Sequence, residues 1–219
     1  MQGLGYAYAL YPALRALYAG DARRDAVRRH LGLFNTHPYF AAAMVGAAVR
    51  LEERISSGLA DPLDVKRFRE ALAAPLAAIG HAFFWYALRP ACALLAALTA
   101  PSLGLGAVGV FLALYNAVHL SVRVWLFRIV YDRAEGLVQA IGIAQFPVGT
   151  VFLRRAAAAL AGAVAAQLCI LAGRQAGALG FVAAGAAALV GVAFVGRIPA
   201  YALAYAALFT AVFAGLVLQ

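Results

Sequence analysis

Long apolar runs separated by short polar interruptions make up most of this chain. Up to residue 70 the runs are short and alternate with clusters of charge, whereas beyond it the chain is almost continuously apolar. A membrane-spanning helix needs roughly 20 predominantly apolar residues, so runs of this kind indicate helices inside a bilayer. We predict an all-α, polytopic membrane protein with broken or re-entrant helices and an N-terminal interfacial amphipathic region.

The segment 28–54 carries the most informative interruption. As one helix, residues 31–51 would extend about 31 Å at about 1.5 Å per residue, which matches a bilayer core of roughly 30 Å. Pro38 interrupts this run, because it has no backbone donor and disfavours helical geometry at His37. We therefore predict a broken or re-entrant, hairpin-like segment whose freed backbone groups face protein or water.

The first predicted region, residues 1–70, combines interfacial helices with this hairpin-like membrane segment. Leucine and tyrosine recur at near-helical spacing over residues 3–19, which favours a helix at the membrane surface. Residues 21–30 predict a basic amphipathic helix, with Asp21 as its N-cap.

The second predicted region, residues 71–219, is a membrane core of about five transmembrane or re-entrant helices. Proline or glycine marks the predicted breaks in its first half: Pro75, Gly80, Pro90 and Pro101. An arginine-bearing connection is expected at residues 123–135, where Arg123 and Arg128 would be loop charges. Three cleaner spans are predicted at 156–173, 177–196 and 199–218.

Composition excludes a soluble globular protein. Of the 219 residues 65% are hydrophobic and 12% charged, and the mean hydropathy is +0.85, whereas soluble domains carry about 25% charged residues. The net charge is +9, but the basic residues lie between apolar runs instead of forming a patch. We therefore expect contact with membrane lipid, no nucleic acid, and a cytoplasmic or interfacial N-terminal third.

The spacing of reactive residues does not support catalytic or metal chemistry. Cys92 and Cys169 lie inside apolar runs, where we expect them to pack and not to form a disulfide or bind metal. No nucleophile–base pair and no glycine-rich phosphate loop is visible, so we expect no enzyme, no cofactor and no metal. The N-terminus has neither a basic region nor a clean cleavage site, so no signal peptide is expected.

Three ordered motifs lie in the first 90 residues. MQGLGYAYALYPALRALY opens the chain, RHLGLFNTHP and LEE fall within residues 29–53, and PLAAIG, FW and LRP fall within residues 75–90. They resemble the signatures M(Q)xxGFxxxxxPxxxxLY, RHLxFFNTxPxxxxxIxGxxxALEE and GPLAGIGDxxFWGTxRP of the IID membrane component of the mannose/fructose/sorbose family of the sugar phosphotransferase system. We identify a compact, divergent member, because Gly80-His81 stands where the family has Gly-Asp.

The resemblance implies a membrane subunit of a phosphoenolpyruvate-dependent sugar permease of the bacterial inner membrane. Such a subunit forms the path for a mannose-class hexose jointly with a IIC subunit, while cytoplasmic IIA and IIB carry the phosphorylated histidines. It is therefore not itself an enzyme, and a higher oligomer of IIC–IID pairs is expected. Two alternatives stay open: a degenerate IID-like subunit with a regulatory or assembly role and no transport, and an unrelated small membrane channel or scaffold.

Polar residues near the predicted break are candidates for the sugar path or its gate, because amides and carboxylates bind sugar hydroxyls. Together with nearby aromatic and imidazole groups, the candidates are Asn35, Thr36, His37, Glu52, Glu53, His81 and Trp85. The alternative is structural. Asn35 and Thr36 would then cap the break, and the two glutamates would pair with Arg50 and Arg54.

The histidines and Trp85 also admit two interpretations each. His37 is alternatively expected to satisfy the broken backbone, and His30, within a run of arginines, to be solvated. His81 either preserves hydrogen bonding to a sugar or marks altered function. Trp85 either stacks on a sugar ring or belongs to an interfacial aromatic belt.

Overall fold

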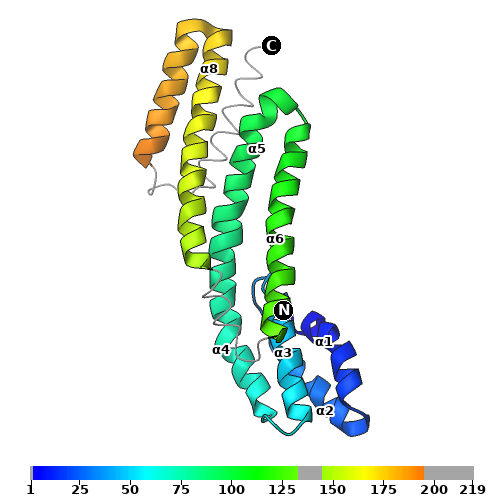
Figure 1. The fold of residues 1–219 in the computed structure, drawn as a ribbon. Coiled ribbons are helices and arrows are strands. Elements are labelled where there is room, and N and C mark those ends of the chain that lie inside the picture. The colour runs from blue at the N-terminus through cyan, green and yellow to red at the C-terminus, as the bar shows by residue number, and fades with distance from the viewer. Residues whose placement is uncertain (1, 133–144, 195–219) are drawn as a thin grey trace. The chain divides into compact units, whose positions relative to one another are not determined.

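The computed structural model describes residues 2–132 and 145–194, and these residues form helices and connecting loops without any strand. The helices in chain order are α1 (Gly3–Leu17), α2 (Gly20–His30), α3 (Ala41–Ser56), α4 (Leu63–Gly80), the π-helix η1 (His81–Leu88), α5 (Arg89–Leu103), α6 (Gly106–Asp132) and α8 (Phe146–Phe194) (Figure 1). The chain divides into two compact units, Met1–Leu160 and Ala161–Gln219, of which the first holds all the candidate residues.

Three helical stretches have the length and apolar composition needed to cross a membrane. Within the described residues these are Leu63–Leu103, Gly106–Asp132 and Phe146–Gln175. The prediction of an all-α polytopic membrane protein is confirmed. The predicted span at 199–218 lies outside the described residues, so the expected number of spans stays a prediction.

The N-terminal helix α1 is amphipathic, as its spacing predicts. Tyr6, Leu10 and Leu14 are buried at intervals of four residues, whereas Leu4 and Tyr8 are exposed. This period places one face of the helix against the rest of the unit, where α1 packs on α2 and α3. Its position at a membrane surface stays a prediction.

The predicted N-cap of α2 is wrong. The helix begins at Gly20 after Ala19, without a side-chain cap, and Asp21 lies in its first turn, where it pairs with Arg24 at 2.9 Å. Gly20 has a positive φ of 54°, which glycine adopts without steric cost, so the chain enters the helix one residue earlier. The carboxylate of Asp21 still favours the positive end of the helix dipole.

The predicted interruption of the segment 28–54 is confirmed. Helix α2 ends at His30 and α3 begins at Ala41, with an irregular loop between them. Pro38 has no amide hydrogen to donate to the carbonyl of Phe34, four residues earlier, and that carbonyl accepts instead from the amide of Gln2 at 3.0 Å. The carbonyl of His37 accepts from the amides of Phe40 at 2.9 Å and Ala41 at 3.1 Å. The insertion of this segment into a bilayer stays a prediction.

The breaks predicted at Pro75, Gly80 and Pro90 are wrong, because α4, η1 and α5 form one continuous helical stretch of 41 residues (Figure 1). Pro75 lies on an exposed face, where its ring does not disturb the packing. Pro90 is the second residue after the π-helix, where the change of hydrogen-bonding register accommodates a residue without an amide hydrogen. The break near Pro101 is confirmed, since α5 ends at Leu103.

The connection predicted at residues 123–135 is also wrong as far as Asp132, and its last three residues lie outside the described part of the chain. Helix α6 continues through Arg123 and Arg128 to Asp132, and it buries Leu126 and Val130 one turn apart. Apolar residues at helical spacing therefore outweigh the two arginines in this segment. In α8, Gly177 has a positive φ of 61° and interrupts the helix, as predicted between the spans 156–173 and 177–196.

Helices α3 and α6 make the closest long-range packing in the first unit. A Cβ at Gly46 would approach the carbonyl oxygen of Phe127 to 3.0 Å, so glycine permits the two backbones to lie close together. Beside them, Phe40 of the loop, Phe84 of η1 and Phe146 of α8 pack in one apolar core. This core holds the loop 31–40 between helices that are distant in sequence.

Candidate functional site

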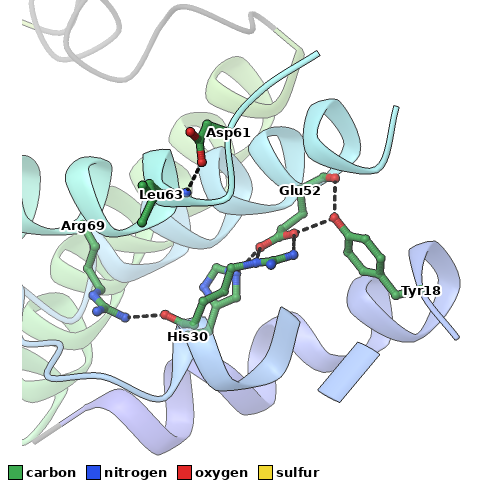
Figure 2. Close-up of polar contacts among 7 residues, drawn as sticks. Tyr18, His30, Glu52, Asp61, Leu63 and Arg69 are labelled. Atoms are coloured by element: carbon green, nitrogen blue, oxygen red, sulfur yellow. Dashed lines mark hydrogen bonds and ion pairs between the residues drawn. The ribbon is translucent and has the colours of Figure 1, made fainter. Parts of the chain in front are cut away.

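Glu52 is fully buried in α3 and lies at the centre of a polar cluster (Figure 2). Arg29 donates from Nε to Oε1 at 2.7 Å and from Nη2 to Oε2 at 2.8 Å. His30 Nε2 lies 2.7 Å from Oε1, and the Tyr18 hydroxyl donates to Oε2 at 2.8 Å. We call these residues, Tyr18, Arg29, His30 and Glu52, the Glu52 cluster.

The cluster stabilises the ionised form of its carboxylate. Burial alone would raise the pKa of Glu52, but hydrogen bonds from His30, Arg29 and Tyr18 outweigh burial and lower this pKa to about 2. A carboxylate offers about four acceptor positions, and these donors occupy them. A sugar hydroxyl would therefore have to displace one of the donors to reach Glu52.

The Glu52 cluster connects elements that are distant in sequence. Tyr18 follows α1, Arg29 and His30 end α2, and Glu52 belongs to α3. From α4, Arg69 Nη1 donates to the carbonyl of Arg29 at 3.0 Å, as Figure 2 shows. The expectation that His30 is solvated is wrong, because its ring is fully buried and turned toward the carboxylate.

Glu53 occupies a different environment from Glu52. Its Oε2 accepts from Arg50 Nη1 at 2.9 Å, and its Oε1 accepts from the Tyr131 hydroxyl of α6 at 2.8 Å. The predicted pairing of Glu53 with Arg50 is confirmed. Among the described residues Arg54 has no ion-pair partner, so the predicted pairing with Arg54 is wrong.

The loop 31–40 is held by the first residues of the chain. The Gln2 side chain donates to the carbonyl of Thr36 at 3.0 Å and accepts from its amide at 3.1 Å. Thr36 is buried, and its hydroxyl has no hydrogen-bond partner among the described residues. Asn35 is exposed, and neither residue supplies the side-chain cap of α3 that one interpretation predicted.

His37 is fully buried among aromatic rings from η1. Its ring stacks on Phe84 with centroids 5.2 Å apart, and the rings of His81 and Trp85 meet it edge-on at 5.2 and 5.1 Å. A Cβ at residue 80 would overlap the His37 side chain, so Gly80 permits this approach. We call His37, Tyr39, His81, Phe84 and Trp85 the His37 cluster.

The protonation of His37 follows from its surroundings. Burial, and to a smaller extent the neighbouring His81, lowers the pKa of His37 to about 4. The amide of Tyr39 lies 3.4 Å from Nδ1, which assigns the proton of the neutral ring to Nε2. This Nε2 is buried and has no partner among the described residues, so His37 holds an unused donor.

The His37 cluster extends to α6 through Tyr39. The ring of Tyr39 stacks on His119 with centroids 4.3 Å apart, and its hydroxyl lies 3.1 Å from that of Tyr115. His119 Nε2 lies 2.8 Å from Asn116 Oδ1. Imidazole, hydroxyl and aromatic groups from the loop, η1 and α6 therefore meet in one place.

The structure separates the sequence-predicted candidates into different environments. His37, His81 and Trp85 lie together, whereas Glu52 belongs to the other cluster and Asn35 to neither. The local satisfaction of the broken backbone by His37 is confirmed through Tyr39. In the part of the chain that the structure describes, no group of histidine, cysteine and carboxylate side chains has the geometry of a metal site.

The sequence-based candidates lack several residues of the two clusters, including Tyr18, Arg29 and Tyr39. They also lack Gln2, which holds the loop 31–40. Each contributes through a contact with an element far along the chain, as in the pair of Tyr18 and Glu52, which are 34 residues apart. The available signal was the presence of Gln2, Tyr18 and Arg29 inside the motifs that carry the family resemblance.

Similarity to known proteins covers most of the described chain. The family model for the IID component of the mannose/fructose/sorbose family of phosphotransferase systems matches residues 1–146. The mannose-specific EIID component of Escherichia coli (strain K12) is 36% identical over 145 residues, which are 65% of this chain and 51% of that protein. The fructose permease IID component of Bacillus subtilis (strain 168) is 31% identical over 64% of this chain and 51% of that protein.

Two solved structures share the fold. The complex of the mannose transporter ManYZ with microcin E492 contains a chain that is 25% identical and matches with a TM-score of 0.58, covering 100% of this chain and 89% of that one. A second membrane protein is 33% identical, with a TM-score of 0.66 over 75% of this chain and 62% of that one. This chain spans about half the length of the curated relatives. The chain belongs to the family of IID components of the mannose/fructose/sorbose phosphotransferase systems.

Proposed function

We propose that this chain is a membrane subunit of a phosphoenolpyruvate-dependent sugar permease and forms the path for a mannose-class hexose with a IIC subunit. The names of its relatives support this, since they are mannose-specific, fructose and sorbose IID components. The structural match to a chain of the mannose transporter ManYZ supports a membrane partner.

The observation that carries the proposal is the His37 cluster, beside a π-helix within a stretch suited to span a membrane. Sugar sites combine polar groups with aromatic rings, and the cluster supplies an unused buried donor next to Trp85, whose side chain is 39% exposed. Single π-helical turns inside α-helices also occur frequently at functional sites.

We divide the sequence-predicted candidates into residues that line the sugar path or its gate and residues that hold the neighbouring helices in place. Asn35, Thr36, His37, His81 and Trp85 line the path or its gate. Glu52 and Glu53 act on the gate by holding α3 against its neighbours, since their oxygens are already occupied by internal donors.

The remaining parts of the system follow from the same proposal. Phosphate transfer takes place on cytoplasmic IIA and IIB, so this chain is a non-catalytic subunit. The complex lies in the bacterial inner membrane and contains more than one IIC–IID pair. Mannose-class specificity is shared with the IIC subunit.

Deletion of the gene, followed by measurement of phosphoenolpyruvate-dependent sugar uptake, tests the function. We expect uptake of at least one mannose-class sugar to be lost and to return when the gene is restored. Affinity purification of the tagged chain from membranes should also recover a IIC subunit. Normal uptake of every mannose-class sugar in the deletion strain would favour the regulatory or assembly role instead.

A substitution in the His37 cluster tests the site. Trp85→Ala should reduce uptake at unchanged membrane abundance, whereas Trp125→Ala, an equally exposed tryptophan on α6, should leave uptake unchanged. Equal uptake in the two variants would contradict the assignment of Trp85 to the path.

A further inference from the structure

A mainly apolar groove of about 590 Å³ lies on the first unit. No residue of the Glu52 or His37 cluster lines it, although Tyr6 in its wall meets the ring of His30 edge-on, with centroids 5.7 Å apart. Its walls come from α1, the loop 31–40, α3 and α6, and they include Ala9, Phe34, Ala42 and Phe127. Small side chains on α1 and α3 leave the groove open along its length. Its volume lies within the range of about 300 to 1,000 Å³ that is usual for small-molecule sites.

The polar side chains that line this groove are Tyr6, Gln2, which is bonded to the backbone of Thr36, and one cation, Arg123. Arg123 is exposed on α6, and among the described residues it has no carboxylate within ion-pair distance. The carboxylates of α3 already have partners, Glu52 with Arg29 and Glu53 with Arg50 and Tyr131. Asp132, on the same helix, is about 14 Å away along the axis at about 1.5 Å per residue.

The unpaired guanidinium of Arg123 would be stabilised by an anion from outside the described part of the chain. Helix α6 is one of the three stretches suited to span a membrane, and an arginine that faces hydrocarbon without a partner is costly. Arg123 lines the groove together with residues of α1, the helix predicted to lie at the membrane surface, so its long side chain can extend toward the headgroup layer. The anion that a bilayer supplies at this depth is lipid phosphate, which a guanidinium binds with two parallel hydrogen bonds.

We propose that this groove is a specific site for an anionic phospholipid, with an acyl chain between α1, α3 and α6 and the phosphate on Arg123. The acyl chain gains little by leaving other lipid tails, because both surroundings are apolar. The groove therefore positions the acyl chain by its shape, and the guanidinium of Arg123 makes the site selective for an anionic headgroup. The bound lipid joins α1 to α6, two elements that otherwise meet mainly through α3.

Native mass spectrometry of the full chain, extracted from membranes and supplied with phosphatidylglycerol or phosphatidylcholine, tests the proposal. We expect retained phosphatidylglycerol in preference to phosphatidylcholine, and about tenfold weaker retention in Arg123→Gln, as for the loss of one charged hydrogen-bonding group. Arg128→Gln is the matched control, because Arg128 is also exposed on α6 and lies outside the groove. Equal loss in both variants, or no preference between the lipids, would overturn the site.

A second experiment separates a lipid from a protein occupant. Ala42→Phe should fill the groove and reduce phosphatidylglycerol retention at an unchanged melting temperature. A photoreactive amino acid at position 42, activated in intact membranes, should yield a lipid adduct. A crosslink to a polypeptide, whether a partner subunit or a second copy of this chain, would show that protein covers the groove and would overturn the proposal.

Discussion

Arg29 donates two hydrogen bonds to the buried carboxylate of Glu52, at 2.7 and 2.8 Å, although 23 residues separate them in the chain. This pair closes the N-terminal helices around the loop 31–40, because Arg29 ends α2 and Glu52 lies on α3. The same loop carries Thr36 and His37 toward η1. The ion pair and the candidate path are therefore parts of one arrangement.

Glu52→Gln should destabilise the protein, because it leaves Arg29 and His30 without a charged acceptor in a buried place. We expect a loss of about 3 kcal/mol in the free energy of unfolding, the usual result of breaking one side of a buried pair. Thermal unfolding of the purified chain measures this loss. Glu53→Gln is the control and should cost clearly less, since the side chains of Glu53 and Arg50 are 26% and 42% exposed. Equal losses of unfolding free energy in the two variants would show that burial does not make the contacts of Glu52 more stabilising than those of Glu53.

Protonation of Glu52 at low pH should lower the free energy of unfolding within a defined pH range. Because the folded pKa of Glu52 is lowered to about 2 from 4.5, the unfolded state binds more protons between these values. The stabilising contribution is therefore fully present above about pH 4.5 and is lost as the pH falls toward 2. Melting temperatures recorded from pH 6 to pH 2.5 should fall less steeply in Glu52→Gln than in the wild type. Parallel curves would contradict the lowered pKa.

Gly80→Ala should disturb the His37 cluster by steric overlap. The added Cβ would collide with the Cβ and Cγ of His37, and overpacking of this kind costs about 1 to 3 kcal/mol. Gly109→Ala serves as the matched control, because a Cβ at Gly109 meets no atom within 4 Å. We expect a lower melting temperature for the first variant and an unchanged or slightly higher one for the second. A neutral Gly80→Ala would show that His37 can move away without cost.

His81→Asp should raise the pKa of His37. The imidazole of His81 bonds the carbonyl of Ala77 at 2.6 Å and lowers the pKa of His37 by charge repulsion, whereas an aspartate would attract the proton. An opposite charge at this separation raises a histidine pKa by about 1 or more. An NMR titration of the labelled His37 ring measures the change, with His81→Asn as the uncharged control. An identical His37 pKa in both variants would exclude electrostatic coupling between the two positions.

Local pattern was sufficient for much of the helical architecture. The apolar runs predicted membrane helices, the spacing of tyrosine and leucine predicted α1, and Pro38 predicted the loop between α2 and α3. These features depend on hydrogen bonding and burial within a few turns of chain, which sequence period and proline geometry report directly. The ordered motifs of the first 90 residues also identified the family.

The predictions of helix breaks and loops were wrong where they depended on a single residue and not on the residues around it. Pro90 and the Gly80-His81 pair suggested breaks, but the π-helix absorbs the register change within a continuous stretch. Arg123 suggested a loop, but the apolar residues around it continue α6. A proline, a glycine or a charge destabilises a helix locally. The helix still forms where the packing of its other residues contributes more free energy than that local effect removes.

The sequence by itself determined that this is an all-helical membrane protein of the IID family with an interrupted segment at Pro38. Only the tertiary structure decided that Glu52 pairs with Arg29 and His30, and that His37 lies beneath η1 beside Trp85. Both arrangements join residues from different helices, whose distances depend on how buried surfaces fit together. Helical period and residue type carry no information about such distances, because they specify which face is buried and not which partner covers it.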